Sequence, residues 1–149
     1  MLIYIGADHR GFKLKEALKN YLKESGYQEV TDAGNHQYDK NDDYPDFGVK
    51  VAEKVSLDPE NSRGILICGS GVGMDIVANR FANVRSVLAS NPEQAEDSRI
   101  DDNTNILSLA ADFLTENEAK KILTIWLQTD FSEEERFRRR LEKIDKIGK

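Results

Sequence analysis

Apolar runs of strand character alternate with segments of helical periodicity along the chain, and this alternation constrains the fold more than any other feature. Five strands are predicted, over residues 2–6, 28–32, 64–68, 84–89 and 106–109. A helical segment follows each strand, and these helices are expected to carry Phe12 to Leu22, Pro45 to Val55, Met74 to Phe81, Pro92 to about Arg99, and Ile122 to Leu127. The sequence therefore predicts repeated strand–helix units.

Two pairs of residues have the spacing of a capping box, in which each member satisfies a backbone N–H at a helix start. Thr115 with Glu118 predicts the beginning of the fifth helix. Ser132 with Glu135 repeats the pattern and predicts the beginning of a charged final helix.

Repeated strand–helix units predict an α/β fold, with right-handed crossovers and helices on both faces of a parallel sheet. We expect a three-layer, doubly wound, Rossmann-like sheet of five parallel strands with a C-terminal helix, as a single domain over residues 1–149. The expected strand order is 2-1-3-4-5, in which strands one and three are neighbours and their helices leave to opposite faces. Ligands bind at such a switch point, here between residues 7–11 and 68–73.

The composition argues against several function classes. No apolar run approaches the ~20 residues of a membrane span, and the N-terminus lacks the basic region of a signal peptide. We therefore expect a cytoplasmic protein. The single cysteine cannot form an internal disulfide, and the net charge of −6 argues against nucleic acid or a membrane surface as the main partner.

A glycine-rich loop follows the third strand. Gly69, Gly71 and Gly73 alternate with other residues where a helix is expected to begin, which allows backbone N–H groups to converge on an anion. The alternative is a tight turn that needs glycine only for its backbone geometry. The loop has no Gly-Lys-Ser/Thr sequence, and Met74 stands where a dinucleotide fingerprint has its third glycine, so a nicotinamide cofactor is not expected.

Cys68 ends the third strand directly before this loop. A thiol at a helix N-terminus has its thiolate stabilised and can act as a nucleophile or general base. A lone cysteine is equally compatible with a small buried hydrophobe.

Two further pairs of polar residues could contribute to an anion site. Asp8 and His9 end the first strand, where they could hold a hydroxyl or a phosphate, although Asp8 could simply cap the first helix. Arg136 and Arg140 lie one turn apart and could clamp a phosphate, or pair with neighbouring glutamates instead. One cysteine and two histidines show no zinc-ligand spacing, so a zinc site is not expected.

Several segments together resemble the ribose-5-phosphate isomerase B family, which also contains galactose-6-phosphate isomerase subunits. The resemblance covers almost the whole chain, in order and with suitable spacing. The matching segments are Gly6-Ala7-Asp8-His9-Arg10-Gly11-Phe12, Asp43-Tyr44-Pro45-Asp46, Gly64 to Met74 with its Cys-Gly-Ser-Gly-Val-Gly stretch, Ala78-Asn79-Arg80-Phe81, Asp102-Asn103-Thr104-Asn105 and the terminal arginine helix.

This resemblance implies an aldose–ketose isomerase of carbohydrate metabolism, acting on ribose 5-phosphate and ribulose 5-phosphate in the pentose phosphate pathway. It also implies a homodimer with active sites between subunits, and no metal or organic cofactor. Cys68 would move a proton from C2 to C1 of the open-chain sugar through a cis-enediolate. The expected catalytic set is Cys68, Ser70, Asp8 and Asp101, and the expected substrate-binding set is His9, Tyr44, Gly69, Gly71, Gly73, Asp102, Asn103, Arg136 and Arg140.

Two positions depart from the family pattern. Asp101 stands where many members have a histidine that assists opening of the furanose ring, so Asp101 or Asp8 would have to act instead. Asp112 stands where the family often has a phosphate-binding arginine, and Arg138, Arg139 or Arg10 could compensate. These departures leave two alternatives open: a hexose 6-phosphate of the allose or galactose type as substrate, or a non-catalytic sugar-phosphate-binding subunit.

Overall fold

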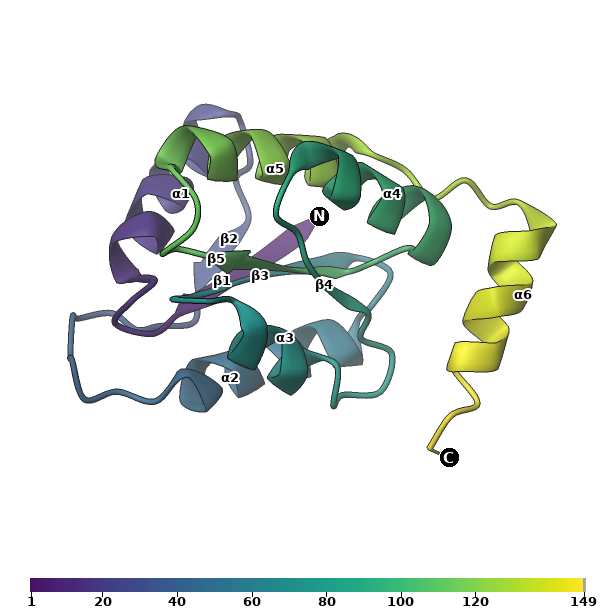
Figure 1. Ribbon diagram of the computed structural model, residues 1–149, viewed down its shortest axis with the longest axis horizontal. Coiled ribbons are helices and arrows are strands. Elements are labelled where there is room, and N and C mark those ends of the chain that lie inside the picture. Colours follow the sequence, from purple (N-terminus) through teal and green to yellow (C-terminus); the bar gives the residue numbers. More distant parts are fainter. Residues whose placement is uncertain (149) are drawn as a thin grey trace.

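The computed structural model describes residues 1–148 and contains one fully parallel, five-stranded sheet (Figure 1). Its strands are β1 (Leu2–Ala7), β2 (Val30–Asp32), β3 (Ser62–Cys68), β4 (Ser86–Leu88) and β5 (Ile106–Ala110). Every neighbouring pair runs parallel, and helices cover both faces, so the predicted three-layer, doubly wound architecture is confirmed.

The predicted strand order is wrong at one edge of the sheet. The observed order is β2-β1-β3-β5-β4, so β5 rather than β4 lies beside β3. All five residues of β5 are buried, whereas the three residues of β4 are only partly buried. A strand that is apolar on both faces is stable inside a parallel sheet, and a short, half-buried strand fits the edge.

The helices divide between the two faces. Helices α1 (Phe12–Glu24), α4 (Pro92–Asp102) and α5 (Glu116–Gln128) cover one face, and α2 (Tyr44–Leu57) and α3 (Val72–Ala78) cover the other (Figure 1). A separate apolar core fills each interlayer space. Helix α6 (Glu135–Ile144) stands apart from both layers and packs against α4.

Local sequence signals gave correct helix starts in some places and not in others. The Thr115–Glu118 capping box is formed, with N–H···O bonds of 2.7 and 3.1 Å. The second expected box is not formed: α6 has Glu134 as its N-cap residue, and the Ser132 hydroxyl accepts only from the Glu134 N–H at 3.4 Å.

Helix α3 is shorter than expected and ends before Phe81. The Asn79 side chain stops it, because its amide oxygen accepts the Ser86 N–H at 2.9 Å and its amide nitrogen donates to the Ser86 carbonyl at 3.1 Å. These bonds tie the end of α3 to the start of β4.

The carboxyl ends of β1 and β3 lie side by side, and α1 and α3 leave them toward opposite faces of the sheet. The fold therefore has its switch point between the two loops that the sequence analysis nominated. Among residues 1–148, no helix combines the length and apolar character needed to cross a bilayer.

Candidate active site

Cys68 and the glycine loop form the centre of the candidate site. Cys68 is the last residue of β3 and is 4% exposed, and its Sγ accepts the N–H of Gly71 at 3.2 Å. Gly71 has a φ of +76°, a left-handed conformation that side chains rarely adopt, and α3 begins at the next residue.

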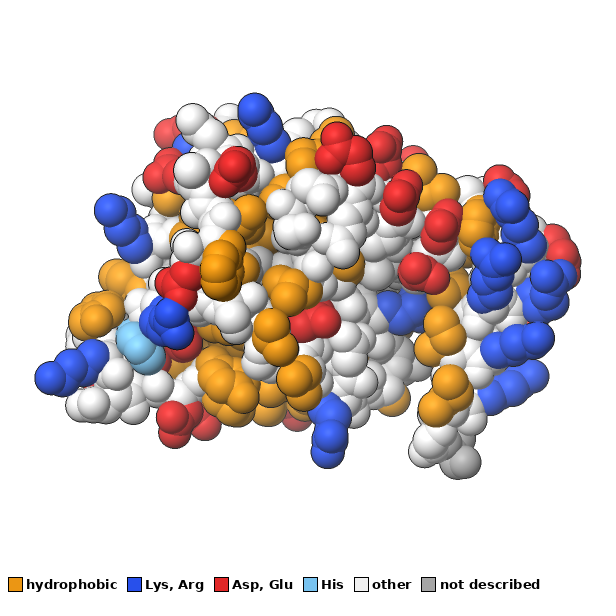
Figure 2. All heavy atoms as spheres, in the orientation of Figure 1, with side chains coloured by type: hydrophobic (Ala, Val, Ile, Leu, Met, Phe, Trp, Pro, Cys, Tyr) orange, Lys and Arg blue, Asp and Glu red, His pale blue; other side chains and the backbone are white. Residues whose placement is uncertain are grey.

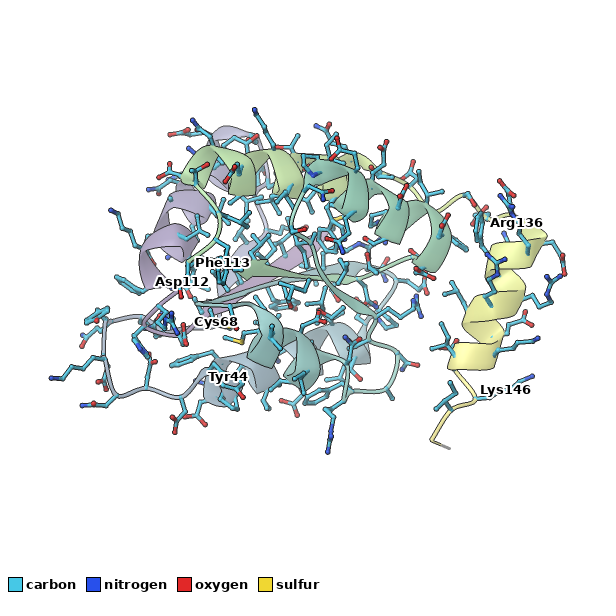
Figure 3. The ribbon with its side chains drawn as sticks, viewed as in Figure 1. Tyr44, Cys68, Asp112, Phe113, Arg136 and Lys146 are labelled. Atoms are coloured by element: carbon cyan, nitrogen blue, oxygen red, sulfur yellow. The ribbon has the colours of Figure 1, made fainter. Side chains whose placement is uncertain are left out.

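Side chains from neighbouring elements pack against the loop at positions where glycine has no Cβ atom. A Cβ atom at Gly73 would lie 2.6 Å from ring carbons of Tyr44, and one at Gly69 would collide with Arg10 and lie 2.8 Å from Asp112 Oδ2. Figure 3 shows Tyr44, Cys68 and Asp112 gathered at this end of the sheet. The glycines thus serve close approach as well as backbone geometry.

The loop retains hydrogen-bonding capacity that the protein itself does not use. Ser70 is exposed, and within the described part of the chain its N–H has no acceptor. The N–H of Gly73 lies in the first turn of α3, where helix geometry offers no partner. The Gly71 N–H, in contrast, is engaged by the Cys68 sulfur.

Asp8 is almost fully buried beside this loop. Its Oδ1 accepts the N–H groups of Arg10 and Gly11, both at 3.0 Å, so the carboxylate holds the turn that precedes α1. Burial raises the pKa of Asp8 above its usual value, against the Gly11 hydrogen bond and the charge of His9. Asp8 therefore does not cap α1, whose N-cap residue Gly11 has no side-chain cap hydrogen bond, and Asp8 Oδ2 has no hydrogen-bond partner among residues 1–148.

His9 is oriented by a residue that sequence reasoning missed. Its Nδ1 lies 2.7 Å from Asp42 Oδ1, and its backbone N–H donates to the same oxygen at 2.9 Å. Asp42 in turn accepts from Asn35 Nδ2 at 2.9 Å, and the buried ammonium of Lys15 donates to the Asn35 carbonyl at 2.7 Å. A chain of hydrogen bonds thus connects the interior of α1 to the candidate site.

The loop after β1 and the loop before α2 together contain the one group of potential metal ligands found among the described residues. Ligand atoms of Asp8, His9 and Asp42 lie within 4.8 Å of one another. The short hydrogen bond between His9 Nδ1 and Asp42 Oδ1 explains why these atoms lie so close together. A cation that used both atoms as ligands would have to break this bond.

The remaining predicted residues lie at the other end of the sheet. Asp101 and Asp102 end α4, and Asn103 is its C-cap, shortly before β5 begins at Ile106. Arg136 and Arg140 lie on α6, and Figure 3 shows Arg136 far from Cys68. Within one copy of the chain, the predicted residues therefore form two separate groups. We call the first the nest half; it contains Asp8, His9, Tyr44, Cys68 and the loop 69–73. We call the second the helix half; it contains Asp101, Asp102, Asn103, Arg136 and Arg140.

The helix half carries a strongly basic surface. The Arg136 and Arg140 guanidinium groups lie 4.5 and 5.5 Å from the centre of the Phe137 ring. Arg136 also donates to Glu134 at 2.9 Å, so the glutamate-pairing alternative is correct for this residue. Arg140 has no carboxylate within ion-pair distance in the part of the chain described.

Asp112 is paired with one of the three arginines considered for compensation. Arg10 Nη2 contacts Asp112 Oδ2, whereas Arg138 and Arg139 pair with Glu133 and Glu135 on their own segment. The contact joins residues 102 positions apart, so no local pattern could have predicted it.

Comparison with known proteins identifies the class as an aldose–ketose isomerase. The chain belongs to the ribose/galactose isomerase family, whose model matches residues 3–144. It is 40% identical to a probable ribose-5-phosphate isomerase B of Mycoplasma genitalium, over 99% of this chain and 95% of that protein. It is 39% identical to the ribose-5-phosphate isomerase B of Escherichia coli, over 97% of this chain and 95% of that protein.

Solved structures agree with this assignment. The ribose-5-phosphate isomerase B of Mycoplasma genitalium, solved with bound ribulose-5-phosphate, superposes with a TM-score of 0.92 at 39% identity, covering 96% of this chain and 93% of that one. The enzyme from Clostridium thermocellum gives a TM-score of 0.93 at 40% identity, covering 99% and 97%.

Proposed function

We propose that this protein interconverts ribose 5-phosphate and ribulose 5-phosphate through a cis-enediolate, with Cys68 as the base. The observation that carries the proposal is the position of the Cys68 sulfur, which accepts the Gly71 N–H at 3.2 Å inside a glycine loop that opens a helix. The ribulose-5-phosphate bound by the Mycoplasma genitalium relative supports the choice of substrate.

In the proposed reaction, the thiolate removes the C2 proton of the open-chain aldose. The electron pair forms the C1–C2 double bond, and negative charge moves to the oxygen on C1. Amides of the glycine loop stabilise this charge, an effect worth about 10²–10³ in rate for one donor. The thiol then returns its proton to C1, while the O2 hydroxyl proton is lost and O1 gains one. A positioned base contributes roughly 10²–10⁴-fold.

The other polar residues act on the parts of the sugar that do not react. Asp8 Oδ2 accepts a sugar hydroxyl, and Tyr44 lines the cleft. His9, fixed by Asp42, donates to the phosphate, together with Arg136 and Arg140. Asp8 or Asp101 assists ring opening, in place of the histidine found in many relatives.

We further propose that the protein acts as a homodimer in which the helix half of each subunit covers the nest half of the other. Both halves expose large apolar side chains, visible as orange areas in Figure 2, which an isologous interface would bury. Val72, Ile76 and Phe113 are 49%, 59% and 77% exposed near the nest, and Ile144 and Ile147 are 45% and 78% exposed at the end of α6.

Mixing two inactive variants tests the shared site. In Cys68→Ala the nest half is disabled, and in Arg136→Ala/Arg140→Ala the helix half is disabled. A heterodimer of the two contains one intact site, so unfolding and refolding an equal mixture should restore about a quarter of the activity. No recovery, with heterodimer demonstrated by differential tagging, would contradict the shared site.

A hexose 6-phosphate substrate is the second candidate, and Asp112 favours it, because this residue departs from the family pattern and is paired with Arg10 beside the nest. Turnover of ribose, allose and galactose phosphates by the purified protein separates the two. The proposal expects the highest kcat/KM for ribose 5-phosphate. Tight binding of every sugar without isomerisation would instead identify a non-catalytic subunit.

A further inference from the structure

Arg10 and Asp112 bridge the end of the strand that carries Cys68. Arg10 follows β1 and Asp112 follows β5, and these two strands flank β3 on either side. The Arg10 Nη2–Asp112 Oδ2 contact therefore passes across the carboxyl end of β3. The Asp112 N–H also donates to the Gly69 carbonyl at 3.0 Å, which fixes the turn that presents the carboxylate.

The guanidinium lies directly against the residue that follows Cys68. A Cβ atom at Gly69 would collide with Arg10 Nε and Cζ, so the absence of a side chain there is what admits the cation. The Arg10 and Asp112 side chains are 56% and 36% exposed. Exposed ion pairs contribute little to stability, so the fold gives no reason for this pair.

The pair retains donors for a ligand. A guanidinium carries five N–H groups, and Asp112 is the one acceptor found for the Arg10 side chain within residues 1–148. Asp112 alone would place a negative charge beside the thiolate and the enediolate. Arg10 neutralises that charge, and its remaining N–H groups stay available as donors beside Gly69.

We propose that Arg10 is a substrate-contacting residue that stabilises the negative charge developing on the sugar oxygens, and that Asp112 is a positioning residue that holds the guanidinium over Gly69. This inference rests on the proposed isomerase function. Because Gly69 adjoins the base, the guanidinium acts on the C1–C2 end and not on the remote phosphate. Its removal is therefore expected to lower kcat more than it raises KM.

The test measures kcat and KM for ribose 5-phosphate in Arg10→Met, Asp112→Asn and the double variant. Lys13→Met is the matched control, since Lys13 is an exposed cation three residues further along. Arg10→Met should lower kcat about 10²-fold and change KM less than about threefold, while Lys13→Met changes neither. Circular dichroism should show that all variants are folded.

The double variant tests the positioning role. Asp112→Asn should lower kcat by less than Arg10→Met does, and the double variant should be more active than Arg10→Met because the uncovered carboxylate is gone. Such rescue would not occur if Asp112 merely supported the fold.

Three results would overturn the inference. The first is a wild-type kcat in Arg10→Met. The second is an increase in KM alone in this variant, which would assign the guanidinium to the phosphate. The third is an equal loss of kcat in Lys13→Met, which would indicate general electrostatic attraction. Absence of turnover in the parent protein would refute the proposed function, and the Arg10 inference with it. Turnover in the parent with an unaffected Arg10→Met variant would refute the Arg10 inference alone.

Discussion

The buried ion pair beneath the site makes an asymmetric prediction about stability. Lys15 is fully buried in α1, and its ammonium lies 2.7 and 2.9 Å from the two oxygens of Asp32. Asp32 is 16% exposed, and it has additional donors in Lys19 at 2.6 Å and the Gly34 N–H at 2.9 Å. The carboxylate can therefore remain satisfied without Lys15. Without Asp32, the buried ammonium would keep only the Asn35 carbonyl at 2.7 Å and the more exposed Glu16 carboxylate at 3.1 Å.

Asp32→Asn should cost about 3–5 kcal/mol, the usual effect of leaving one buried charge without its partner. Lys15→Met, which removes the ammonium and keeps most of the apolar stem volume, should cost less than about 1.5 kcal/mol. A typical domain has about 5–15 kcal/mol of stability, so the first change is severe and the second mild. With an m-value near 2 kcal/mol/M, the two urea midpoints should differ by about 1–2 M.

Urea unfolding followed by circular dichroism at fixed protein concentration measures both variants. Burial raises the pKa of Asp32, but hydrogen bonds from Lys15 and Lys19 outweigh this and hold the pKa below its usual value. A lowered pKa in the folded state gives stability above the unfolded pKa that is lost as pH falls through the folded one. The deficit of Asp32→Asn should therefore shrink below about pH 4. Equal destabilisation by the two substitutions at pH 7 would refute this reasoning.

Three further predictions concern the site. Burial raises the pKa of Asp8, so protonation of this carboxyl favours the folded state, and its contribution to stability declines as pH rises through the folded-state pKa. Asp8→Asn should therefore be at least as stable as the parent at pH 7 and yet have a raised KM. A clear loss of stability would contradict this reasoning. Gly73→Ala should lower kcat/KM at least about tenfold, because the added Cβ would lie 2.6 Å from the Tyr44 ring. In thermal unfolding, Gly73→Ala/Tyr44→Ala should have a higher Tm than Gly73→Ala, because the ring that collides with the Cβ is gone. Asp101→His should retain activity and raise kcat where ring opening limits the rate, as a coupled ribulose 5-phosphate assay would show; complete loss would give Asp101 an indispensable role.

Periodicity and local signals identified all five strands, because each is short and lies between helical segments, although β2 contains only one apolar residue. They could not order the last two strands, since sheet order depends on how deeply each strand is buried. The sequence does contain a difference in apolar character between the two strands. Ile106–Ala110 is almost wholly apolar, whereas the three-residue strand that begins at Ser86 follows a charged arginine.

The candidate site was predictable where it follows chain order. The thiol, the glycine loop and the helix start are consecutive, so their geometry follows from the strand–loop–helix connection. Asp42 and Arg10 were missed or left open because their partners lie 33 and 102 residues away, and only tertiary packing brings them together. The separation of Arg136 from Cys68 likewise depends on where α6 packs.

The central claim is that the Cys68 sulfur transfers the proton between C2 and C1. Its most direct test is exchange of the C2 proton of ribose 5-phosphate with deuterated solvent, followed by proton NMR in the parent protein and in Cys68→Ala. The account predicts exchange during turnover in the parent and its near abolition in a Cys68→Ala variant with native circular dichroism and thermal stability. Full exchange and isomerisation by that variant would contradict it.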